Sequence, residues 1–143
     1  MSEHDTVMTA GGRAEWGRLV RIGDGLSTVA YQTWSAVRLR IQDRGDRHLT
    51  CFFTGMDEVT DGGRVTSGFG HAVMTEHDGD ELWARVDWSI DGDRDIGRFT
   101  FQSGTGKWAG AAGTVTGQLF LLPSAGESSH IGFYEGHGRV TLA

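Results

Sequence analysis

Short segments with alternating apolar residues recur along this chain, and compact turn signals rich in Gly and Asp separate most of them. The turn signals are residues 23–25, 43–46, 60–63, 78–80 and 91–93. The segments are 16–22, 26–41, 48–53, 65–75, 81–90, 96–101, 114–122 and 131–142. They are rich in Val, Phe, Trp, Tyr and Thr, and none sustains the apolar spacing of an amphipathic helix. The pattern predicts an all-β protein.

About eight strands without helices form either an antiparallel sandwich or a closed barrel. We favour the barrel because closure leaves no free edges, and this chain has only one proline, Pro123, to guard them. A chain of 143 residues suits one domain. We predict a single antiparallel eight-stranded closed β-barrel with a central apolar cavity over residues 13–143. Residues 1–12 are polar and small, and we expect a flexible N-terminal tail there.

A run of glycines lies between the predicted strands 96–101 and 114–122, and it can be compared with a phosphate-binding loop. Such a loop opens a helix, and no helix pattern follows this run. Lys107 is followed by Trp108 rather than Ser or Thr, and the spacing of Gly104, Gly106 and Gly110 misses the dinucleotide fingerprint. We therefore predict that these glycines form a corner of the barrel and that Trp108 plugs its end.

The charge balance limits which partners the chain can have, and the cysteine count indicates the cellular compartment. Thirteen Lys and Arg against 19 Asp and Glu give a formal net charge of −6, which argues against nucleic acid as a partner. We see no signal peptide and no apolar stretch long enough to form a membrane helix. The single cysteine, Cys51, excludes a disulfide within the chain. We expect a cytoplasmic protein with no nucleic-acid or membrane partner.

The second half of the chain resembles the allene oxide cyclase-like barrel family. The resemblance rests on the Asp-Gly-Asp hairpin within 77–85, the Gly-Thr-Gly-Lys-Trp-Ala-Gly-Ala-Ala-Gly turn at 104–113 and the Phe-Tyr-Glu-Gly segment at 133–136. It covers roughly residues 68–142, and Ser103 stands where many members have Gly. The resemblance implies an eight-stranded barrel with an apolar cavity, often a dimer or trimer. Characterised members include cyclases and isomerases of oily or polyketide-like substrates.

The more apolar face of each strand should point into the barrel, and it carries a few polar groups with it. Alternation with Phe69 and Val73 brings His71 inward, and the same reasoning gives Arg18, Tyr31 and Cys51. We name His71, Tyr31 and Arg18 as candidate catalytic residues, because imidazole moves protons near neutral pH and the other two can polarise an oxygen. Each has a plainer alternative: a hydrogen-bonded core histidine, a core aromatic, and an arginine turned to solvent by a bulge.

The candidate substrate-binding residues are mostly large and apolar. They are Cys51, Trp88, Phe99, Phe101 and Tyr134. The sequence leaves undecided which face of the last strand points inward. One choice places Tyr134, Val140 and Leu142 inside, and a slip of one residue places Glu135 and His137 there instead. We favour Tyr134 inward.

No metal site or cofactor is expected. The six histidines form no His-x-His or His-Glu-x-x-His pair. Asp57 and Glu58, and likewise Asp91, Asp93 and Asp95, are expected as loop charge without calcium-loop spacing.

An apolar wall with a few polar groups is typical of a ligand pocket. We hypothesise a small cofactor-independent enzyme that catalyses isomerisation, cyclisation or elimination of a mostly apolar small molecule inside the barrel. The alternative is a non-catalytic carrier of a lipophilic small molecule. A third hypothesis is an assembly subunit whose barrel is packed solid by its Trp residues.

Overall fold

Nine strands and one short 3-10 helix make up the computed structural model of the chain, which describes residues 1–126 and 129–143. In chain order the elements are β1 (Ser2–Trp16), β2 (Val20–Gly23), β3 (Leu26–Ile41), β4 (Gly45–Thr60), β5 (Val65–Glu76), β6 (Glu81–Asp91), β7 (Arg94–Gly104), η1 (Gly106–Trp108), β8 (Ala112–Gly126) and β9 (Ser129–Leu142).

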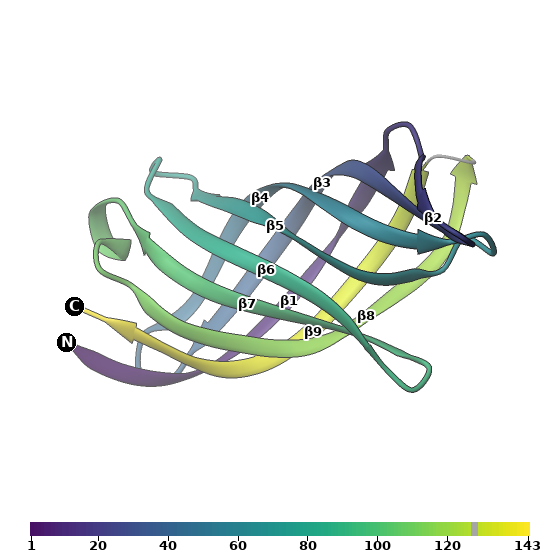
Figure 1. The fold of residues 1–143 in the computed structure, drawn as a ribbon. Helices are drawn as coiled ribbons and strands as arrows, with labels where there is room; N and C mark the ends of the chain where they lie inside the picture. Colours follow the sequence, from purple (N-terminus) through teal and green to yellow (C-terminus); the bar gives the residue numbers. More distant parts are fainter. Residues whose placement is uncertain (127–128) are drawn as a thin grey trace.

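The eight long strands close into an antiparallel barrel (Figure 1). Each of β3 to β9 pairs with its neighbour in sequence, and β1 lies between β9 and β3 to complete the ring. The short β2 extends from the barrel as a hairpin with β3. The predicted fold class and the predicted number of barrel strands are confirmed.

The expected N-terminal tail is wrong, because residues 2–12 belong to β1. This strand pairs along its length with β9 and from Thr6 onward with β3, so its backbone groups are satisfied on both sides. Its side chains alternate, with His4, Thr6 and Met8 buried, and the His4 Nδ1 donates to the Gln42 carbonyl at 2.9 Å. The strand was not recognised from sequence because most of its inward residues are small or polar and its pairing partners are distant in the chain.

Both termini lie at the end of the barrel where η1 is found (Figure 1), and buried side chains fill the interior there. Trp108 of η1 is 1% exposed there, and Met8, Leu39, Met74 and Leu82 are fully buried in the same core. The glycine-rich corner and its Trp108 plug are therefore confirmed.

Three glycines of that corner, Gly106, Gly110 and Gly113, have backbone conformations that other residues rarely adopt. Gly110 has φ +76° and Gly113 has φ +115°, and a Cβ on Gly113 would lie 2.1 Å from the Arg139 carbonyl oxygen. The close approach of the strands at this corner therefore depends on glycines.

In the described part of the chain, no helix is both long and apolar enough to cross a membrane.

Candidate functional site

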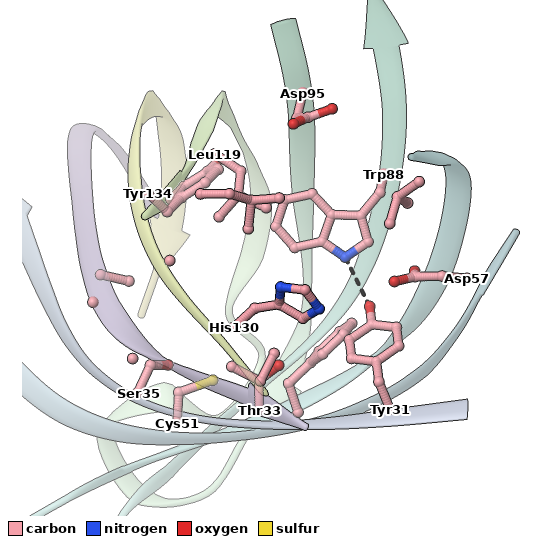
Figure 2. Close-up of a pocket in the computed structure, with 18 of the residues that line it drawn as sticks. Tyr31, Thr33, Ser35, Cys51, Asp57, Trp88, Asp95, Leu119, His130 and Tyr134 are labelled. Carbon is pink, nitrogen blue, oxygen red and sulfur yellow. Dashed lines mark hydrogen bonds between the residues drawn. The ribbon is translucent and has the colours of Figure 1, made fainter. Parts of the chain in front are cut away.

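The barrel interior leaves space at the end opposite the termini, where β1 finishes at Trp16. A pocket of about 140 Å³ lies there and is partly open to solvent (Figure 2). It is confined to this end, since buried side chains such as Met8 and Leu39 fill the rest of the interior. The expected central apolar cavity is therefore not shown.

Aromatic rings form much of the pocket wall. They are Trp16, Tyr31, Phe53, Trp88, Phe99 and Tyr134. The Trp88 indole stands at their centre and meets the rings of Phe53, Phe99 and Tyr134 edge-on, with centroids 6.2–6.5 Å apart. Such edge-to-face contacts favour a fixed arrangement.

Both ends of the Trp88 indole are held. Its Nε1 donates a hydrogen bond of 2.9 Å to the Tyr31 hydroxyl (Figure 2). Its six-membered ring lies against Gly97 of β7, where an added Cβ would come within 2.2 Å of Cζ3. Only a residue without a side chain allows the ring this close to the β7 backbone.

Asp57 of β4 is the buried acid of the pocket. Its side chain points inward beside the Tyr31 hydroxyl and is 6% exposed (Figure 2). It also covers Gly68 of β5, whose added Cβ would lie 2.1 Å from Oδ1. Oδ1 has no hydrogen-bond partner among the described residues.

Burial raises the pKa of Asp57 to about 7, because the apolar surroundings penalise the charged carboxylate, and the nearby Tyr31 hydroxyl opposes this in part. Burial also raises the pKa of Tyr31, and the charge of Asp57 raises it further. Tyr31 therefore stays protonated near neutral pH. Its oxygen accepts from Trp88, so its own hydrogen remains available to Asp57 or to a ligand oxygen.

Two further polar side chains line the pocket. His130 of β9 packs against Trp16 with ring centroids 4.6 Å apart, and its buried Nε2 has no partner among the described residues. Asp95 of β7 also lines the pocket and is half-buried. In Figure 2 it lies on a different side of the Trp88 indole from Asp57.

Most of the predicted substrate-binding residues are brought together here. Cys51, Trp88, Phe99 and Tyr134 line the pocket, whereas Phe101 is 4% exposed in the core and outside the lining. Burial raises the pKa of the Cys51 thiol to about 11, so the thiol packs as a protonated, weakly polar group.

The last strand faces as we favoured, with Tyr134, Val140 and Leu142 buried and Glu135 and His137 exposed. The Tyr134 hydroxyl donates to the Gly97 carbonyl at 2.8 Å. This bond occupies the hydroxyl hydrogen, and we assign Tyr134 to the wall of the pocket.

Of the candidate catalytic residues, only Tyr31 reaches the pocket. The inward facing expected for His71 is wrong, because Phe53 of β4 points inward and pairs with Ala72 of β5, which turns His71 to the outer surface. The prediction failed because it placed Phe69 inside the barrel. Phe69 points outward, is 47% exposed and lies under the Arg85 guanidinium. His71 lines an open groove on the outside instead.

Arg18 is likewise exposed, in the connection from β1 to β2. Val20 and Ile22, which were expected to carry it inward, are 53% and 50% exposed. The physical reason is that β2 lies outside the closed ring of strands, so neither of its faces meets the interior.

Sequence reasoning missed Asp57, Asp95 and His130. For Asp57 a signal existed: the inward alternation through Leu49, Cys51 and Phe53 continues to position 57. The charge pattern concealed it, because an acidic pair near a turn signal is usually a solvated loop.

The described residues contain no group of three or more His, Cys, Asp or Glu side chains arranged to hold a metal ion. Comparison with protein-family models, with curated proteins and with solved structures found no match.

Proposed function

We propose that this chain is a small cofactor-independent enzyme that moves a proton on a small carbonyl compound held in the pocket. The observation that carries the proposal is the buried Asp57 carboxyl, which lines the pocket, has an Oδ1 without a hydrogen-bond partner among the described residues, and has a pKa raised to about 7 by burial. A base works best when its pKa lies near the working pH, because it is then both available and strong enough.

Tyr31 supplies the complementary donor. As the Asp57 carboxylate takes a proton from the carbon beside a carbonyl, negative charge develops on the carbonyl oxygen. The Tyr31 hydroxyl, fixed by Trp88, donates a hydrogen bond to that oxygen. Protonated Asp57 then returns the proton to another carbon, which completes an isomerisation without any co-reactant.

The size and lining of the pocket limit the substrate. A volume of about 140 Å³ holds a single ring with a short chain rather than a long lipid. The aromatic wall favours a flat, mostly apolar molecule and excludes most of the water that would solvate the reacting groups. Isomerisation therefore suits this pocket better than cyclisation of a large polyketide.

The sequence features add three finer proposals. The resemblance to the allene oxide cyclase-like family supports isomerase or cyclase chemistry, and it supports a dimer or trimer. The unpaired Cys51 supports a cytoplasmic location.

The proposal is tested with 5-nitrobenzisoxazole, a neutral ring that opens when a base removes one proton and releases a coloured phenolate. We expect turnover to rise with pH and to reach half its plateau near pH 7, as Asp57 ionises. Asp57→Asn should lower the rate by about 100-fold or more, since the variant has no base at that position.

Glu58→Gln is the matched control, because Glu58 is the next residue of β4 and is exposed on the outer face. It should keep the wild-type rate. Turnover that survives Asp57→Asn, or that Glu58→Gln lowers equally, contradicts the proposal. Saturable binding of the probe without turnover would favour the carrier alternative.

A further inference from the structure

Apart from the phenols of Tyr31 and Tyr134 and the thiol of Cys51, the ionisable side chains that line the pocket are two carboxyls and one imidazole. The carboxyls belong to Asp57 and Asp95, the imidazole belongs to His130, and the described lining contains no Lys or Arg. An anionic ligand would therefore meet two acids and no permanent positive charge. At the short distances of a small apolar pocket this repulsion is weakly screened.

The two carboxyls line the same pocket on different sides of the Trp88 indole (Figure 2). Asp57 lies beside the Tyr31 hydroxyl, which accepts from Nε1 at the pyrrole end of the Trp88 indole. Asp95 lies two residues from Gly97 on β7, and Gly97 contacts the six-membered ring of Trp88. Residues two apart on a strand face the same side about 7 Å from each other. A ligand along the indole can thus reach both carboxyls.

Neither carboxyl forms an ion pair with a cationic side chain in the described part of the chain. Asp95 forms no ion pair with the described residues, although the neighbouring Arg94 pairs with Asp91 at 2.6 Å. Asp57 is more than nine-tenths buried, points into the pocket and has an unpartnered Oδ1. Two acids left without cations in an aromatic pocket are positioned to receive one from a ligand.

We propose that the substrate is a small organic cation, an arylalkyl or cyclic alkyl amine whose ammonium group lies at Asp95 and whose reacting end lies at Asp57 and Tyr31. This inference rests on the proposed function for the role of the second end. The aromatic rings add to the selection, because the Trp88 face attracts a cation through its quadrupole. Fatty acids and other anionic ligands are disfavoured, because the described lining contains Asp57 and Asp95 and no Lys or Arg.

The experiment compares three ligands of nearly the same shape: 2-phenylethylamine, 2-phenylethanol and phenylacetate. Their affinities are measured by calorimetry with the full chain at about pH 8.5, above the pKa of Asp57. We expect the amine to bind at least about tenfold more tightly than the alcohol, which corresponds to about 1.4 kcal/mol. Phenylacetate should bind most weakly.

Asp95→Asn should lower the affinity of the amine to that of the alcohol. The matched control is Asp93→Asn, which removes one negative charge from the exposed turn that precedes β7 and should keep the preference for the amine. Far-ultraviolet circular dichroism of both variants checks that the barrel remains folded.

Three results would overturn the inference: phenylacetate binding as tightly as the amine, an amine preference that survives Asp95→Asn, or no binding of any of the three at about 10 mM. The benzisoxazole reaction separates the two ideas, because its substrate is neutral. If that reaction depends on Asp57 while the amine preference is absent, the proposed function stands and this inference falls. An amine preference without any Asp57-dependent turnover leaves a carrier of amines.

Discussion

The replacement Asp57→Asn should remove a pH dependence of stability that this one carboxyl imposes on the barrel. The side chain is 6% exposed, and its folded-state pKa is raised from 3.8 to about 7, chiefly by burial. The folded protein therefore holds this proton more tightly than the unfolded chain does. The resulting stability is fully present below about pH 4 and declines as the pH rises, until both states are ionised above about pH 7.

The magnitude follows from the size of that pKa shift. Each unit corresponds to about 1.4 kcal/mol, so the whole shift is worth about 4 kcal/mol. Between about pH 5 and pH 8.5, a range convenient for denaturation, roughly 3 kcal/mol of it should be lost. Asn has nearly the same shape and does not titrate, so the variant lacks this loss.

The assay is urea denaturation of the wild type and the variant, followed by tryptophan fluorescence, at several pH values across that range. The informative quantity is the difference in unfolding free energy between the two proteins, because every other titrating group contributes equally to both. An Asn amide without a partner adds a constant cost at all pH values, and the change with pH is unaffected by it. We expect the unfolding free energy of the variant, relative to that of the wild type, to increase by roughly 3 kcal/mol from low to high pH.

A difference that stays constant within about 0.5 kcal/mol would refute the reasoning, because it would mean that Asp57 ionises alike in both states. Glu58→Gln, on the exposed face of the same strand, is the control and should show no such trend.

Three further replacements test other parts of the structure. Tyr31→Phe removes the hydroxyl that opposes the effect of burial on the pKa of Asp57, and it leaves Trp88 Nε1 unpartnered. Carboxyl NMR should show the pKa of Asp57 above 7, and denaturation should show an unfolding free energy lower by about 1–3 kcal/mol. An unchanged pKa would argue against a contact between Tyr31 and Asp57. Trp108→Ala should cost about 3–5 kcal/mol through the cavity it leaves, while Trp108→Phe should cost clearly less, since it also removes an unpartnered Nε1; equal losses would contradict the description of the plug. His71→Ala should leave benzisoxazole turnover and stability within experimental error of the wild type, because this side chain lies outside the barrel; a large loss of turnover would return it to the candidate site.

The placement of side chains inside the barrel was predictable where one face of a strand is clearly the more apolar. Phe53 and Tyr31 follow this rule, and their strands were oriented correctly from sequence. Segment 65–75 has apolar residues on both faces, and there the alternation selected the wrong one. Phe69 and Val73 face solvent, whereas the small Ala72 faces inward.

The acid of the candidate site was not predictable from residue type, because burying a carboxyl is unfavourable and charge near a turn usually marks the surface. Asp57 is tolerated inside because Gly68 on the paired strand leaves room for its carboxyl and Tyr31 contacts it. That combination joins three strands, and no local pattern contains it.

The sequence by itself determined that the chain is an all-β barrel with a glycine-rich corner, because turn signals and two-residue periodicity are local properties of the chain. Only the tertiary structure decided that residues 2–12 complete the ring, that β2 lies outside it, and that Asp57 and Asp95 line one pocket with Trp88. The reason is physical: the register between paired strands decides which face of each strand points inward, and that register depends on the partner strand. Local periodicity therefore predicts a strand, and long-range pairing decides which of its side chains can meet a substrate.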